Sequence, residues 1–155
     1  MTIRSKKLAV SACLLGRPCR YDGGSKRSDA ITELVARVRA SGGAVVAVCP
    51  EELGGLGTPR PAADLRGGDG DAVLSGHAKV RTVGADRDVT QAFVDGAEAA
   101  AQLADGCDQA VLKARSPSCG VGRTHVDGEV APGDGVFAAL LRRRGVALWT
   151  DEQLT

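Results

Sequence analysis

The sequence predicts an α/β fold in which a mostly parallel β-sheet carries helices on both faces. Short apolar runs alternate along the chain with longer segments of helical spacing, and turn and capping residues separate the two kinds. The 155 residues, 43% hydrophobic and 25% charged, suffice for one well-buried core. Because parallel strands need crossover connections, this alternation is typical of a Rossmann-like or flavodoxin-like sheet. We expect a single domain over residues 1–155.

The first half of the chain predicts a βαβ unit. Residues 7–13 (KLAVSAC) and 44–49 (AVVAVC) are apolar runs of the kind that form buried strands. Between them, Ser28 or Asp29 can cap a helix whose apolar positions repeat at helical spacing. The glycine pair 42–43 ends that helix.

The second half continues the alternation after a short insertion. Residues 66–87 contain two alternating stretches, DAVLSG and AKVRTVG, separated by Gly76 and His77, which predict a small β-hairpin at the sheet edge. From Asp88 an alanine-rich segment predicts a second helix. Residues 109–113 predict a third strand, and after a Gly-rich loop VFAALLRRRG and VALWT predict a third helix and a final strand.

The charge balance and the amino-terminal segment argue against polyanions and membranes as partners. Twenty basic and nineteen acidic residues leave a formal charge of +1, so no strong field attracts the chain to polyanions. The amino terminus, MTIRSKKLAV, lacks the long apolar stretch of a signal peptide or a spanning helix. We therefore expect a cytoplasmic protein, a monomer or weak homodimer, that binds neither polymeric nucleic acid nor a membrane.

The cysteines predict a site at one edge of the sheet. Their number, five, is odd and their spacing is wide, which argues against a disulfide framework. Cys13 closes the first strand, Cys49 closes the second, and Cys119 follows the third. Since ligands bind at the carboxyl edge of such sheets, we expect these three thiols to converge there. Cys107, at a helix end, is expected only to pack in the core.

Several chemistries use converging thiols. A thiol phosphatase needs an arginine after five intervening residues, but Cys19 stands at that distance from Cys13. A zinc site usually shows paired ligand spacings, and neither His77 nor His125 has such a spacing to a cysteine. Three separated cysteines suit a cubane iron–sulfur cluster in which one iron stays open as a Lewis acid. If Cys19 were a fourth ligand, the protein would instead be a cluster-bearing redox or iron-sensing protein; a nucleotide-binding module without catalysis is a third alternative.

Three motifs carry a resemblance to a known family: VSACLLGRPCRYDG at residues 10–23, CPEELGGLGTPRPAAD at 49–64 and KARSPSCG at 113–120. Over nearly its whole length the chain resembles the bacterial thiouracil desulfidases. It departs from the family pattern at Ala62, where a second proline is expected, and at Asp64, where a glutamate is expected.

The resemblance implies a [4Fe-4S] cluster held by Cys13, Cys49 and Cys119. It also implies an enzyme that removes sulfur from a small thiolated pyrimidine, either thiouracil or a thiouridine nucleoside or nucleotide. The products would be the oxo base and sulfide, with no net redox change. Cys19 lies in the first motif, and we do not assign it as a ligand.

The same motifs supply candidate catalytic residues. Glu51, two residues after Cys49, is the expected general base, with Glu52 as second choice. Ser116 and Ser118 are expected to position the substrate, and Lys113 to neutralise a developing anion. Plain structural roles stay open for each of them: a solvated turn for the acidic pair, turn formation for the serines and surface exposure for the lysine.

Four arginines fall in loops at the same edge: Arg17, Arg20, Arg60 and Arg123. A guanidinium binds phosphate with two parallel hydrogen bonds, so these side chains could hold the phosphate of a nucleotide. The alternative for any one of them is an ordinary solvated arginine.

Overall fold

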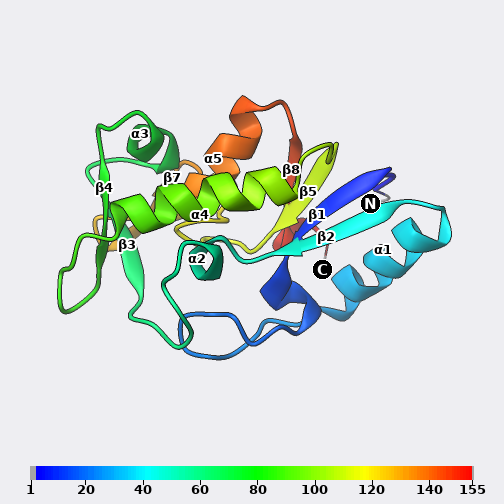
Figure 1. The fold of residues 1–155 in the computed structure, drawn as a ribbon, viewed down its shortest axis with the longest axis horizontal. Helices are drawn as coiled ribbons and strands as arrows, with labels where there is room; N and C mark the ends of the chain where they lie inside the picture. The colour runs from blue at the N-terminus through cyan, green and yellow to red at the C-terminus, as the bar shows by residue number, and fades with distance from the viewer. Residues whose placement is uncertain (1–2, 155) are drawn as a thin grey trace.

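The strands form two four-stranded sheets, seen in a computed structural model that describes residues 3–154 (Figure 1). The first sheet is parallel throughout and has the order β2 (Ala44–Val48), β1 (Lys7–Ser11), β5 (Gln109–Leu112), β8 (Ala147–Thr150). The second is mixed and has the order β4 (Lys79–Thr82), β3 (Ala63–Arg66), β6 (Arg123–Val126), β7 (Glu129–Pro132). The predicted α/β class with a parallel sheet is therefore confirmed.

Helices cover both faces of the parallel sheet, as predicted. They are α1 (Asp29–Ala40), α2 (Pro50–Leu53), α3 (Gly70–Leu74), α4 (Thr90–Leu103) and α5 (Val136–Arg143), with 3₁₀ turns at Ala12–Leu15 and Asp151–Gln153. Helix α1, capped by the Ser28 side chain, buries its apolar residues with Leu8 and Val10 of β1. The alternate β1 residue Ala9 shares the other core with α4 and α5. Within residues 3–154 no helix has the length and apolar character needed to cross a bilayer.

The strand order places a crevice between β1 and β5. From β1 the chain first crosses to β2 on one side and later reaches β5 on the other, so the strand order reverses there. In open α/β sheets this is the point where ligands bind, outside the carboxyl ends of the strands. The ends of β1 and β5 are joined directly, because the Lys113 backbone N–H donates to Ser11 Oγ at 3.0 Å.

The predicted hairpin within residues 66–87 is wrong in its first strand. The stretch DAVLSG lies mostly in helix α3, whose N-terminus is capped by Asp69 Oδ1 accepting from the Ala72 N–H at 3.0 Å. Strand β4 pairs instead with β3, in antiparallel register. A five-residue helix is too short to show its period, so the alternation of apolar residues misled the prediction.

The second sheet was not predicted. The Gly-rich loop after β5 contains the antiparallel pair β6 and β7, and β3 joins it through a parallel pairing of Leu65 with Val126. Between β6 and β7, Asp127 and Gly128 have φ angles of 51° and 84°. An Asp-Gly pair with two positive φ angles is the preferred two-residue hairpin turn, so this dipeptide was the signal that could have revealed the hairpin.

Helix α2 is seated directly on the backbone of α4. A Cβ added at Gly96 of α4 would lie 2.0 Å from the carbonyl oxygen of Pro50, and one added at Gly54 would lie 2.1 Å from that of Ala92. Only glycine allows so close an approach. The short helix that follows Cys49 is thereby fixed against the long helix that spans both sheets (Figure 1).

Candidate active site

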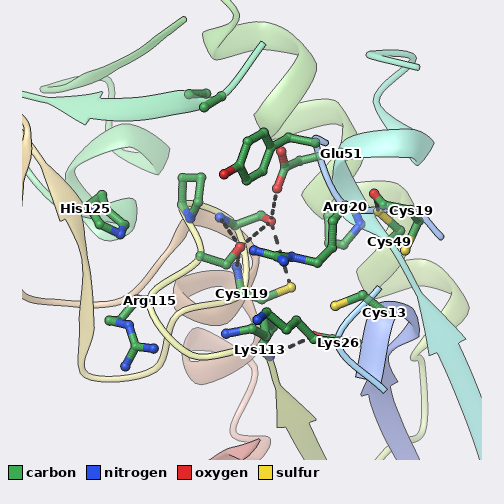
Figure 2. Close-up of a pocket in the computed structure, with 18 of the residues that line it drawn as sticks. Cys13, Cys19, Arg20, Lys26, Cys49, Glu51, Lys113, Arg115, Cys119 and His125 are labelled. Atoms are coloured by element: carbon green, nitrogen blue, oxygen red, sulfur yellow. Dashed lines mark hydrogen bonds between the residues drawn. The ribbon is translucent and has the colours of Figure 1, made fainter. Parts of the chain in front are cut away.

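One cavity of about 610 Å³ lies at the carboxyl edge of the parallel sheet and reaches β3 and β6 of the second sheet. Its volume falls within the range of small-molecule sites. The sequence-predicted site residues that line it are Cys13, Cys49, Glu51, Lys113, Ser116, Ser118 and Cys119 (Figure 2). The fold thus brings together residues from three distant segments. Their chemical roles remain predictions.

Cys13 and Cys119 face one another across the cavity. Cys13 lies in the 3₁₀ turn that follows β1, and Cys119 lies in the loop after β5. Figure 2 shows their sulfur atoms pointing toward each other. Burial raises the pKa of the Cys13 thiol to about 11 and that of Cys119 to about 12. Both are therefore protonated at neutral pH without a metal, and metal binding would release their protons.

Cys49 lies beside Cys19, which sequence reasoning left unassigned. Cys49 is half-buried at the N-terminus of α2, and its sulfur lies 3.6 Å from the Cys19 carbonyl oxygen. The hydrogen bond from the Cys19 thiol lowers the pKa of Cys49 to about 7 and raises that of Cys19. Cys49 is thus the sulfur of this pair that is most easily ionised. Cys107 is buried outside the cavity, in the core shared by both sheets.

Glu51 is held on both carboxylate oxygens. Ser118 Oγ donates to its Oε2 at 2.9 Å, and Arg60 Nε donates to its Oε1 at 3.1 Å. The side chains of Glu51 and Arg60 are only 13% and 5% exposed. A carboxylate with two such donors is fixed in orientation while one face meets the cavity.

Glu52, the second candidate for the general base, does not face the cavity. Its Oε2 accepts from Thr58 Oγ1 at 2.5 Å, and its Oε1 lies 3.7 Å from Arg17. It is not among the residues that line the cavity. The geometry therefore favours Glu51 for chemistry within the cavity.

The two serines shape the loop that carries Cys119. Ser116 Oγ accepts from the N–H groups of Ser118 and Cys119 at 3.2 and 3.0 Å, so it stabilises this turn. Ser118 is 2% exposed and its hydroxyl faces Glu51. Lys113 lines the cavity, and its ammonium donates to the Ala114 carbonyl at 3.1 Å.

The predicted arginines separate into three groups. Arg20 and Arg60 line the cavity, but Arg60 is engaged with Glu51. Arg17 approaches Glu52, and Arg123 is exposed on β6 away from the cavity lining.

Three residues of the cavity with basic side chains were missed by sequence reasoning. They are Lys26, Arg115 and His125, all labelled in Figure 2. Lys26 is brought to the cavity by its backbone N–H, which donates to the Cys13 carbonyl at 2.9 Å. Arg115 has a left-handed φ of 61° and an ion pair with Glu152 at 2.8 Å. No local pattern reveals such residues, because the path of each loop decides where they point.

In three comparisons with known proteins, each match covers nearly the whole chain. Residues 8–153 match the sequence model of the 2-thiouracil desulfurase family. The uncharacterized protein YbbK of Bacillus subtilis (strain 168) is 38% identical over 152 residues, covering 95% of this chain and 97% of that protein. A solved structure described as the [4Fe-4S]-dependent thiouracil desulfidase TudS is 43% identical, with a TM-score of 0.77, over 96% of this chain and 93% of that one.

Proposed function

The chain belongs to the 2-thiouracil desulfurase family, as its motifs predicted, and from this premise we propose that it removes the sulfur of a thiolated pyrimidine as sulfide. In this reaction water replaces sulfur, so that C=S and H₂O give C=O and H₂S. No electrons are gained or lost, and the reaction is non-redox. The observation that carries the proposal is the meeting of Cys13, Cys49 and Cys119 with Glu51 around one cavity.

The donor set fits a [4Fe-4S] cluster, the group on which the similar TudS structure depends. Thiolates are the usual ligands of such clusters, and we propose Cys13, Cys49 and Cys119 as the three. In the part of the chain that the structure describes, only Cys19, Cys49 and Glu52 have ligand atoms all within 4.8 Å, as one ion requires. Cys13, Cys49 and Cys119 are not that close together as a group, and this suits a cubane, because each thiolate binds a different iron. When bound, the cluster would supply an iron without a protein thiolate, a Lewis acid for the thiocarbonyl sulfur.

Glu51 is the proposed general base. Its carboxylate would take a proton from the attacking water and later return it to the departing sulfide. Ser118, which donates to Oε2 of Glu51, holds that oxygen in place beside the Cys119 loop. We propose that Ser116 positions this loop and that Lys113 offsets the negative charge that develops during attack.

A nucleotide is the proposed form of the substrate. Four cationic side chains line the cavity in addition to Arg60: Arg20, Lys26, Lys113 and Arg115. A free thiouracil is neutral and makes no use of so many cations, whereas a phosphate binds ammonium and guanidinium groups strongly. The cavity volume of about 610 Å³ also leaves room beyond a single base.

Sulfide release from a matched series of substrates tests the function. Protein reconstituted without oxygen should bind about four irons per chain. It should release sulfide from thiouracil, thiouridine and thiouridine monophosphate, with the highest kcat/KM for the monophosphate. Replacement of Cys13, Cys49 or Cys119 by serine should abolish iron binding, while the control C107S keeps it. Iron binding without sulfide from any of the three substrates would refute the enzyme and favour a redox or iron-sensing protein.

A further inference from the structure

A second group of possible metal ligands, closer together than the three proposed cluster ligands, lies at the rim of the proposed cluster site. The sulfurs of Cys19 and Cys49 and a carboxylate oxygen of Glu52 all lie within 4.8 Å of one another. Two thiolates bound to one tetrahedral Zn²⁺ stand about 3.8 Å apart, as Zn–S bonds of about 2.3 Å require. We propose that the cluster-free protein binds one thiophilic divalent cation, such as Zn²⁺, at these three side chains.

The backbone positions the three ligands before any ion arrives. Cys49 is the N-cap residue of α2 and Glu52 is its third helical residue, and side chains at these two positions lie close together. This helix is fixed by its close contact with Gly96 of α4. Cys19, the third ligand, is held in place by Arg60, whose Nη2 donates to the Cys19 carbonyl at 2.9 Å.

The carboxylate has the support that a metal ligand needs. Thr58 Oγ1 donates to Glu52 Oε2 at 2.5 Å, so this oxygen already has a fixed hydrogen bond. Among residues 3–154 the other oxygen, Oε1, accepts no hydrogen bond and lies 3.7 Å from Arg17, so we assign this oxygen to the ion. Hydrogen bonds of this kind orient ligating carboxylates. The Glu52 side chain is 28% exposed, whereas Cys19 is 2% exposed, so an ion reaches the site from the Glu52 side.

The ion and the cluster exclude one another, because both use Cys49. This consequence rests on the proposed function, since it assumes that Cys49 is a cluster ligand. The ion site itself does not depend on it. An ion at the rim would withhold one thiolate from the cluster and would have to leave before the cluster is assembled.

Metal titration of the reduced, cluster-free full-length chain tests the site. Co²⁺ serves as the spectroscopic probe, since its thiolate complexes absorb strongly, and Zn²⁺ should then displace it. We expect one ion per chain, no thiolate–Co²⁺ band in C19S or C49S, and an affinity at least about tenfold lower in E52Q. The cavity variants C13S and C119S and the control C107S should bind as the wild type does, and circular dichroism should show all of them folded. Loss of the band in C13S or C119S, or its retention in C19S, would overturn the proposal.

A competition experiment separates this proposal from the function of the enzyme. Zn²⁺ loaded first should block cluster reconstitution in the wild type but not in C19S, which should still bind about four irons. If folded C19S cannot hold the cluster, Cys19 is a cluster ligand and the separate ion site is wrong. If the ion binds as expected but no substrate releases sulfide, only the desulfurising function fails.

Discussion

The contact between α2 and α4 gives the sharpest test of how the active site is positioned. In Gly96→Ala the new Cβ would lie 2.0 Å from the Pro50 carbonyl oxygen, whereas real Cβ atoms essentially never come closer than 3.0 Å. The two backbones must therefore separate by about 1 Å or more. The obstacle is a main-chain oxygen, so no side-chain rotation can relieve it. Helix α2 would move, and Glu51 with it.

Two opposing energies decide the effect on stability. Alanine in a helix interior is favoured over glycine by about 1 kcal/mol. Overpacking of a tight core contact costs about 1–3 kcal/mol, and a rigid backbone neighbour places this case at the upper end. The net loss is about 2 kcal/mol, which for a chain of this size lowers Tm by roughly 4–8 °C. A displacement of about 1 Å at a catalytic group can cost about 100-fold in rate, so if Glu51 is the base we expect a loss of this order in kcat/KM.

Thermal unfolding and sulfide release measure the two effects. Glu98→Ala is the matched control, because Glu98 lies on the same helix and is exposed. It should leave both Tm and kcat/KM close to those of the wild type. A Gly96→Ala protein whose Tm equals or exceeds that of the wild type, with unchanged kcat/KM, would refute the reasoning.

Three further predictions concern single side chains. Glu51→Gln should lower kcat about 10²- to 10⁴-fold with iron content unchanged, because it removes the proposed general base but keeps the shape of the side chain; a variant with full activity contradicts the assignment. Ser118→Ala removes a hydrogen bond to a carboxylate worth about 1.5–3 kcal/mol, so kcat/KM should fall roughly 10- to 100-fold if Glu51 is the base, and no change would argue against it. Burial opposes ionisation of Asp134, but hydrogen bonds from Arg142 and from the Gly122 N–H outweigh it and lower the pKa of this carboxyl below its ordinary 3.8. The stabilisation is present above that value and is lost as the pH falls through the lower pKa of the folded state, so the Tm difference between wild type and Asp134→Asn should shrink below about pH 4.

The parallel sheet was predictable because its signals are local. Short apolar runs gave β1 and β2 within one or two residues of their observed ends, and Ser28 caps α1 as expected. The second sheet was not predictable in the same way. Its strands are four residues long, and β3 pairs with β6 across about 60 residues of chain through a single residue pair. Periodicity over four residues cannot separate such a strand from a loop.

The candidate site, too, was predictable where its signals are local and not where they depend on loops. Cysteines at the ends of parallel strands must approach one edge, and the structure places all three around the same cavity. The contacts of Cys19 with Cys49 and of Ser118 with Glu51 depend instead on the paths of loops, which no spacing rule encodes.

The order of the ligands along the chain has a consequence for biosynthesis. A ribosome adds residues from the amino terminus, so Cys19, Cys49 and Glu52 are all present well before Cys119 is made. Strand β5, which carries the last thiol to its place, enters the sheet beside β1 only after α4 has been synthesised. The three proposed ion ligands are therefore all synthesised before the last of the three proposed cluster ligands.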